Sequence, residues 1–156
     1  MKPKKMTFVC TGNTCRSVMA HKLLESMKQG TVFENVEIDS AGTEAMPYYS
    51  IVGDLKTVMD ENGINYEGHV PKPIDIEILE DSDLVITMTE THSRDIDARF
   101  PGHEDKIKLL SELSGLGTRG IPDPLGMGLE SYRETFRVIE KAVKNIIERF
   151  SDNAER

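Results

Sequence analysis

Hydrophobic positions along the chain follow two periods that alternate from the amino to the carboxyl end. Short apolar or alternating runs predict four strands, at residues 6–10, 36–40, 83–88 and 106–110. Stripes at helical spacing predict helices at residues 17–29, 51–62, 74–80, 91–100 and 130–150, the third of them short. Strands that alternate with helices are typical of a parallel sheet with helices on both faces. The pattern therefore predicts an α/β fold built on a four-stranded parallel sheet.

The length of the chain and the lack of an internal linker predict a single domain over residues 1–156. The 156 residues are enough for a hydrophobic core, and no internal repeat or linker interrupts them. Residues 151–156 are expected to fray, as terminal segments commonly do. Residues 111–127 form a long stretch rich in glycine, and a loop of this length in a compact domain is usually functional.

The stretch from residue 6 to residue 27 carries the strongest chemical signal. A strand ends at Cys10, a loop of small and polar residues follows, and a helical stripe begins directly after Arg16 and Ser17. In such a turn, backbone N–H groups and the helix dipole can surround a tetrahedral oxyanion, and Gly12 is expected to supply the flexible backbone of a tight loop. Arg16 can bind two phosphate oxygens through its planar guanidinium.

The same arrangement places Cys10 for nucleophilic chemistry. The surrounding dipoles favour the thiolate, and a thiolate below a phosphorus atom is a nucleophile in position. The alternative is a buried cysteine that only fills space at the end of a strand, with an unrelated arginine nearby. Strand, loop, Arg-Ser and helix together favour the catalytic interpretation.

The composition of the chain mainly excludes classes of partner. The formal net charge is −8 and the basic residues are scattered, which argues against a nucleic-acid partner. No apolar run approaches the roughly 20 residues that span a bilayer, and residues 6–10 are too short for the apolar part of a signal peptide. We therefore expect no membrane partner and a cytoplasmic location. An anion has to be attracted locally, by dipoles and Arg16, against the overall field.

The two cysteines, Cys10 and Cys15, lie in the same loop. They form neither a disulfide framework nor a zinc spacing, so we expect a reducing compartment and no metal. If Cys10 is a thiolate, Cys15 could form a reversible disulfide with it and protect it from over-oxidation. The alternative is that Cys15 only fills space.

The run VCTGNTCRS followed by a helix resembles the low-molecular-weight protein tyrosine phosphatase family, and CTGNTCRS in particular resembles its bacterial protein-arginine phosphatase branch. The resemblance covers nearly the whole chain and has a second anchor in the late Asp-Pro at Asp123. It implies a phosphate-binding loop after the first strand, a phosphocysteine intermediate and no cofactor. The implied partners are a phosphorylated protein and, in the loop, phosphate or other oxyanions.

The resemblance also assigns roles to single residues. Cys10 would be the nucleophile, Arg16 would bind the phosphoryl group, and Asp123 would be the general acid. Ser17 would stabilise the thiolate, although a helix cap is its ordinary role. Asn13 would hold the loop in its strained shape, braced by Ser40 and His69. The ordinary alternatives are a turn aspartate at Asp123 and a solvated loop histidine at His69.

Substrate choice depends on fewer positions. Thr14 matches the threonine of the arginine-phosphatase branch, whereas Leu125 stands where that branch commonly has phenylalanine, and Val18 and His21 replace its proline and glutamate. Tyr48 and Tyr49 could supply the missing aromatic wall. The expected substrate-binding residues are Thr11, Gly12, Asn13, Thr14, Cys15, Leu125, Tyr48 and Tyr49. The predicted substrate is protein phosphoarginine and the first alternative is protein phosphotyrosine; arsenate reduction and a non-catalytic phosphate-binding module rank below them.

Overall fold

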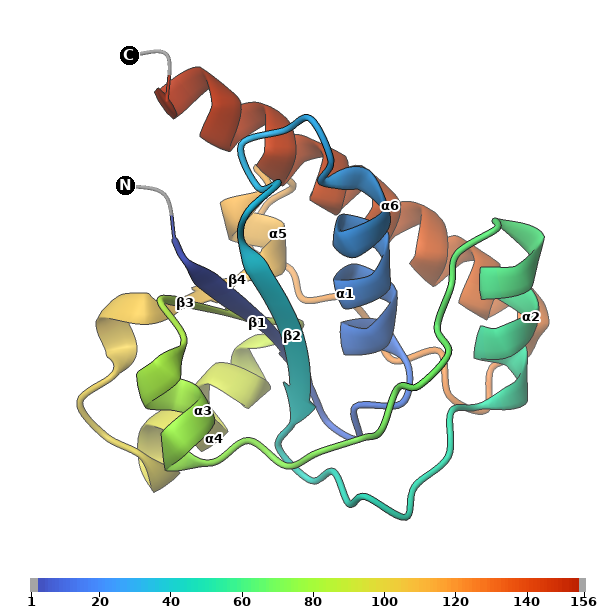
Figure 1. The fold of residues 1–156 in the computed structure, drawn as a ribbon. Coiled ribbons are helices and arrows are strands. Elements are labelled where there is room, and N and C mark those ends of the chain that lie inside the picture. The colour runs from blue at the N-terminus through green and yellow to red at the C-terminus, as the bar shows by residue number, and fades with distance from the viewer. Residues whose placement is uncertain (1–2, 155–156) are drawn as a thin grey trace.

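The computed structural model describes residues 3–154 and contains a four-stranded sheet in which all neighbouring strands are parallel (Figure 1). Its strands are β1 (Lys5–Cys10), β2 (Glu37–Gly42), β3 (Leu84–Thr87) and β4 (Ile107–Leu109), arranged in the order β2-β1-β3-β4. After β1, the next strand in the chain, β2, pairs with one edge of β1, and the later strands β3 and β4 lie on its other side. The carboxyl end of β1 is therefore the point at which α/β sheets bind ligands.

Helices cover both faces of the sheet (Figure 1). The helices are α1 (Arg16–Met27), α2 (Gly53–Glu61), α3 (Ile76–Asp81), α4 (Glu90–Arg99), α5 (Leu110–Leu113) and α6 (Leu129–Ala154), with a 3₁₀ turn at Glu104–Lys106. Helices α1 and α6 pack on one face and α2 packs on α6, while α3 and α4 lie on the opposite face. The predicted α/β fold is confirmed.

The alternation of β1 decides on which face its last residue lies. Met6, Phe8 and Cys10 belong to the larger core, which α1 and α6 cover. Val9 belongs to the smaller core beneath α3 and α4. Because successive side chains of a strand point to opposite faces, the thiol at the end of β1 is directed to the face on which α1 begins.

The predicted elements all occur, in the predicted order, but several ends differ. The loop predicted at 111–127 begins with a short helix, α5, which the sequence pattern did not indicate. Helix α3 begins at Ile76 because the side chain of Asp75 caps it, accepting a hydrogen bond from Ile78 N at 2.8 Å. In addition, no helix of residues 3–154 has both the length and the apolar character needed to cross a membrane.

The carboxyl end of α6 departs most from the prediction. The helix continues to Ala154, whereas we expected fraying from residue 151 onward. Ser151 Oγ donates to Ile147 O at 2.7 Å, and the ring of Phe150 lies 5.1 Å from that of Phe33. The hydrogen bond lies within α6, and the contact between Phe150 and Phe33 ties the last turn to the body of the molecule. Residues 155–156 lie outside the described part of the chain.

Candidate active site

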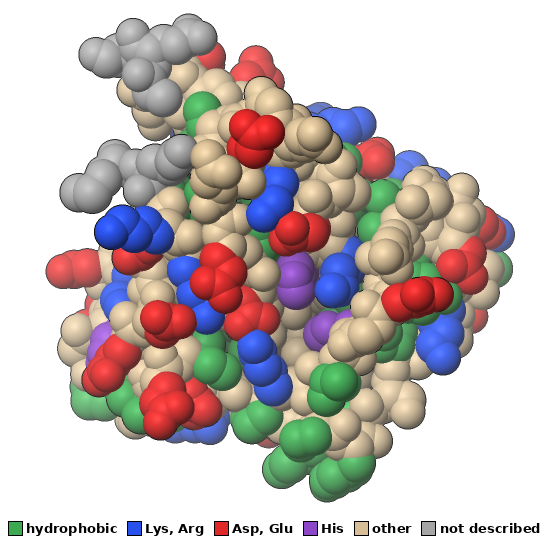
Figure 2. Space-filling model, in the orientation of Figure 1, with side chains coloured by type: hydrophobic (Ala, Val, Ile, Leu, Met, Phe, Trp, Pro, Cys, Tyr) green, Lys and Arg blue, Asp and Glu red, His purple; other side chains and the backbone are tan. Residues whose placement is uncertain are grey.

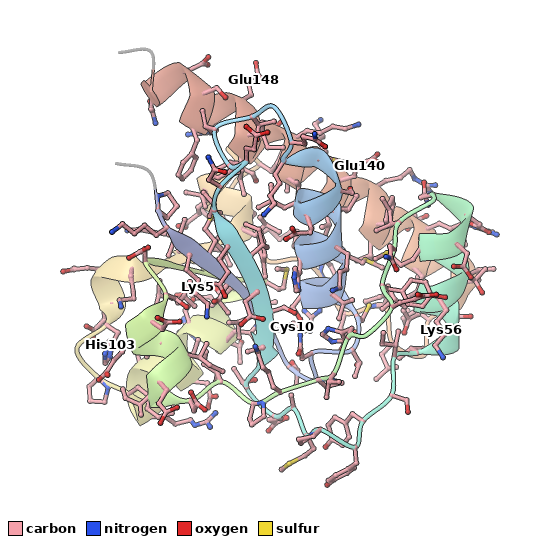
Figure 3. The ribbon with its side chains drawn as sticks, in the orientation of Figure 1. Lys5, Cys10, Lys56, His103, Glu140 and Glu148 are labelled. Carbon is pink, nitrogen blue, oxygen red and sulfur yellow. The ribbon has the colours of Figure 1, made fainter. Side chains whose placement is uncertain are left out.

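The loop of residues 11–15 joins the end of β1 to the start of α1, and Figure 3 shows Cys10 at that end of the strand. A cavity of about 390 Å³ opens over the loop. The residues that line it are Cys10, Thr11, Gly12, Thr14, Cys15, Arg16, Glu44, Tyr49, Ser50, Val52, Asp123 and Leu125. Most of the predicted site residues therefore meet at one cavity, although they come from three separate parts of the chain.

Ser17 lies against the sulfur of Cys10. Its Oγ is 2.9 Å from Cys10 Sγ, and both side chains are buried. The same Oγ accepts a hydrogen bond from Asn13 Nδ2 at 2.8 Å. Because an amide nitrogen can only donate, the hydroxyl proton of Ser17 is left to point at the sulfur. A hydrogen bond donated to sulfur favours its anionic form.

Arg16 is 4% exposed, and its guanidinium is held by the loop between α5 and α6. Nη1 donates to Ile121 O at 2.8 Å, and Nη2 lies 3.6 Å from Asp123 Oδ2. The other carboxylate oxygen of Asp123 accepts from Leu125 N at 3.1 Å. Asp123 therefore lies at the edge of the cavity and faces Arg16, the first residue of α1.

Asn13 is the strained residue of the loop. Its φ of 55° lies in the left-handed region, where non-glycine residues are uncommon. His69 Nε2 donates to its carbonyl at 2.8 Å, and Lys72 N donates to its Oδ1 at 3.1 Å. The predicted contact between His69 and Asn13 is therefore formed. The Asn13 side chain is fully buried behind the loop and does not line the cavity, contrary to its place among the expected substrate-binding residues.

Ser40 does not make the predicted contact with Asn13. Its Oγ lies 3.0 Å from His21 Nδ1, because β2 directs this side chain toward α1, where His21 stands. Burial, together with the nearby charge of Lys22, lowers the pKa of His21 to about 4. The imidazole is therefore neutral at ordinary pH. A histidine at this position gives the serine a partner of its own.

The glycine that the loop requires is Gly42 rather than Gly12. Gly12 does not adopt a positive φ, and a Cβ there would meet only the side chain of Thr14. Gly42 ends β2 directly beneath the loop, where a Cβ would collide with the backbone oxygen of Thr11 and lie 2.9 Å from Asn13 N. Sequence reasoning missed this residue; a glycine at the end of a strand is the signal that could have indicated a close backbone approach.

Lys72 is a second residue that the sequence did not indicate. Its backbone N–H supports Asn13, its carbonyl accepts from Gly42 N at 2.9 Å, and its ammonium lies 2.6 Å from Asp39 Oδ2. Although burial acts to raise it, the pKa of Asp39 is lowered by this hydrogen bond from Lys72. The ion pair thus holds in place the segment that supports the loop of residues 11–15.

The rim of the cavity is apolar and partly aromatic. Tyr49 and Leu125 line it, and both are exposed. Tyr48 does not line it, contrary to the prediction; it is 78% exposed and its ring packs edge-on against Tyr49 with centroids 5.3 Å apart. In Figure 2, hydrophobic side chains gather at the lower edge of the molecule, over the segment between β2 and α2. Tyr49 and Leu125 thus give the mouth of the cavity an apolar surface.

Cys15 also lines the cavity, and both cysteines are free. Burial, with the thiol of Cys10 and the carboxyl of Asp123 nearby, raises the pKa of the Cys15 thiol well above its ordinary value. Cys15 is therefore a neutral thiol beside Cys10, and a resolving role in oxidation stays a prediction.

Comparison with known proteins decides the family. Residues 5–156 match the family described as low molecular weight phosphotyrosine protein phosphatase. The chain belongs to that family. It is 33% identical to a protein-arginine-phosphatase from Bacillus subtilis (strain 168), over 89% of this chain and 91% of the relative. It is 32% identical to the low molecular weight protein-tyrosine-phosphatase Ptp from Acinetobacter johnsonii, over 92% of this chain and 95% of the relative.

A solved relative has the same fold. It is a cysteine-to-serine mutant of the YwlE arginine phosphatase with a phosphorylated active-site serine. Its TM-score is 0.87 at 31% sequence identity, and the match covers 93% of this chain and 94% of the other. The chain is thus a cysteine-based protein phosphatase of a metal-independent family. Within residues 3–154, no group of three or more histidine, cysteine or acidic side chains is placed to hold a metal ion.

Proposed function

We propose that this phosphatase hydrolyses protein phosphoarginine through a phosphocysteine intermediate. The observation that carries the proposal is the position of Thr14, which lines the cavity beside Cys10. Its side chain also lies against Gly12, because a Cβ added to Gly12 would be 3.3 Å from Thr14 Oγ1. A polar, branched side chain here narrows the cavity and offers a hydroxyl to a planar guanidinium. The identity to an arginine phosphatase over most of both chains supports the same substrate class.

In the first step, Cys10 Sγ forms a bond to phosphorus while the bond from phosphorus to the guanidine nitrogen breaks. Arg16 and the amides of residues 11–15 bind the non-bridging oxygens, on which charge accumulates. The protonated carboxyl of Asp123 transfers its proton to the leaving nitrogen. The distance of 3.6 Å between Asp123 Oδ2 and Arg16 Nη2 supports this role, because Arg16 is the residue proposed to bind the phosphoryl oxygens.

In the second step, the Asp123 carboxylate removes a proton from a water molecule. The water oxygen forms a bond to phosphorus, the sulfur–phosphorus bond breaks, and the electron pair returns to Cys10 as a thiolate. The hydrogen bond from Ser17 to the sulfur stabilises that leaving thiolate. Phosphate then leaves the loop. The phosphorylated serine of the YwlE mutant supports a covalent phosphoryl intermediate at this position of the loop.

Phosphotyrosine is the second candidate, and one observation favours it. Tyr49 and Leu125 form an apolar rim on which an aromatic ring could stack, and the Acinetobacter johnsonii relative is a tyrosine phosphatase. Arsenate reduction ranks lower because a disulfide relay needs further cysteines and none follows Cys15. A purely phosphate-binding module is disfavoured because nucleophile, guanidinium and acid line the same cavity.

The deciding experiment measures kcat/KM for a phosphoarginine peptide and a phosphotyrosine peptide of matched sequence. We expect the wild-type protein to prefer phosphoarginine and Thr14→Ile to shift the ratio toward phosphotyrosine, because the larger aliphatic side chain removes the hydroxyl. The matched control is Thr57→Ile, an exposed threonine on α2, which should leave the ratio unchanged. A wild-type preference for phosphotyrosine would overturn the substrate assignment, and an unchanged ratio in Thr14→Ile would remove Thr14 as its cause.

A further inference from the structure

A chain of hydrogen bonds reaches the phosphate loop from the start of α4, on the side opposite α1. His92, in the first turn of α4, is 4% exposed. Its Nδ1 lies 3.1 Å from Thr89 N, and its Nε2 lies 2.9 Å from Thr11 Oγ1. Thr11 is the loop residue directly after Cys10. The contact joins two residues that are 81 positions apart in the sequence.

The first of these contacts fixes the tautomer of His92. A backbone N–H can only donate, so Nδ1 accepts and carries no proton. The proton of the neutral ring is therefore on Nε2, and Nε2 donates to Thr11 Oγ1. Burial, with the positive charge of Arg16 nearby, lowers the pKa of His92 to about 4, so the ring keeps this single proton at ordinary pH.

The second contact leaves the Thr11 hydroxyl with one free direction. Because Oγ1 accepts from His92, its own proton points elsewhere, and within residues 3–154 it meets no other hydrogen-bond partner. Thr11 lines the cavity over Cys10 and also a neighbouring cavity of about 470 Å³, whose walls include His92, Arg16 and Asp123. The free proton is therefore available to an acceptor that enters beside Arg16.

We infer that the Thr11 hydroxyl donates a hydrogen bond either to the phosphoryl group or to the oxygen of the water that attacks it in the second step. His92 is the positioning residue, because its hydrogen bond to Thr11 fixes the hydroxyl as a donor. A hydroxyl that is free to rotate would, in some of its orientations, point a lone pair at the incoming anion, and it would then form no hydrogen bond with it. A hydroxyl whose lone pair is already occupied by His92 offers the proton. This device adds a side-chain donor to the amides of the loop, and it rests on the proposed phosphatase chemistry at Cys10.

The competing explanation is purely structural, since His92 accepts from the backbone N–H of Thr89, the residue that caps the start of α4, and so helps to begin that helix. Two substitutions separate the roles. His92→Asn keeps an acceptor near the position of Nδ1 but is too short to reach Thr11. His92→Gln can place its amide nitrogen near the position of Nε2, and glutamine is common at the third position of a helix.

The experiment measures kcat and KM for para-nitrophenyl phosphate and the inhibition constant of inorganic phosphate. The aryl phosphate makes the test independent of whether the natural substrate carries phosphoarginine or phosphotyrosine. Thr11→Val should lower kcat/KM by about 10- to 100-fold, which corresponds to one hydrogen bond to a charged group, and should weaken phosphate inhibition. Thr11→Ser, which keeps the hydroxyl, should show a smaller loss than Thr11→Val. Thr91→Val is the matched control, since Thr91 lines the neighbouring cavity but not the cavity over Cys10, and its values should stay within twofold of wild type.

The double variant tests whether His92 acts through Thr11. His92→Asn should lower kcat/KM by roughly 2- to 10-fold, the cost of ordering one side chain, and His92→Gln should lower it less. Added to Thr11→Val, His92→Asn should cause almost no further loss, because the hydroxyl that it positions is gone. Thermal unfolding of each variant identifies any loss that comes from α4 itself.

Two results would overturn the inference. One is a Thr11→Val protein that binds phosphate and turns over substrate as the wild type does. The other is full additivity of His92→Asn and Thr11→Val, which would assign His92 a structural role only. A wild-type protein that hydrolyses no phosphate ester would contradict the proposed function instead, so the two failures are distinguishable.

Discussion

Gly42→Ala is the substitution that tests most directly how the fold shapes the phosphate loop. A Cβ at this position would collide with the backbone oxygen of Thr11, lie 2.8 Å from the Cβ of Ala45 and lie 2.9 Å from the backbone nitrogen of Asn13. Two of these three atoms are backbone atoms of the loop, so no rotamer change can relieve the contact. Either the end of β2 or the phosphate loop has to move.

The size of the effect follows from overpacking. Insertion of a methyl group into a packed site typically costs about 1–3 kcal/mol in free energy of unfolding. For a domain of this size, that corresponds to a decrease in Tm of roughly 2–12 °C. Activity should suffer more, because a shift of about 1 Å in a catalytic loop can cost on the order of 100-fold in rate. We expect kcat/KM for para-nitrophenyl phosphate to fall at least about tenfold.

Urea unfolding followed by circular dichroism measures the first effect, and phosphate ester hydrolysis measures the second. The matched control is Gly53→Ala at the start of α2, where a Cβ would meet nothing within 4 Å and φ is not positive. That substitution should leave activity unchanged and raise the free energy of unfolding by up to about 1 kcal/mol. If Gly42→Ala were as stable and as active as Gly53→Ala, the close approach of β2 to the loop would not shape the site.

Cys10→Ser should abolish phosphate ester hydrolysis while circular dichroism stays unchanged; residual activity near wild type would refute the nucleophile. After peroxide treatment, dithiothreitol should restore the activity of the wild type but not of Cys15→Ser; equal recovery would exclude a protective disulfide. Folding lowers the pKa of His21 from 6.5 to about 4, so its stabilising contribution, on the order of 3 kcal/mol, is present above pH 6.5 and lost as pH falls toward 4. His21→Gln should make urea stability less pH-dependent over that range, and an unchanged dependence would contradict the sign.

Local pattern was sufficient to predict the four strands and every helix except α5, and it indicated the residues of the loop after β1. The alternation that ends in Cys10 and the stripe that follows Ser17 are properties of neighbouring residues, so strand, loop and helix could be predicted from the sequence. In the same way, the five residues between Cys10 and Arg16 indicated that both lie at the ends of one loop. Asp123 was accessible through the resemblance, because its Asp-Pro is a second local signal.

Long-range contacts were not accessible in this way. His92 and Thr11 meet only because β3 lies beside β1, and Lys72 supports Asn13 only because its segment crosses the end of β2. The pairing of Ser40 with His21 instead of Asn13 depends on which side chain on α1 stands opposite β2. No sequence spacing indicates which residue each of these side chains contacts.

The sequence by itself determined an α/β chain with Cys10 and Arg16 at the two ends of one strand-to-helix turn, because those properties depend on residues a few positions apart. Only the tertiary structure decided what holds that turn in shape. The close approach of Gly42, the support from Lys72 and the proton direction set by His92 each require atoms from distant segments to meet within about 3 Å. Contacts of that kind depend on how the strands and helices pack, which periodicity does not encode.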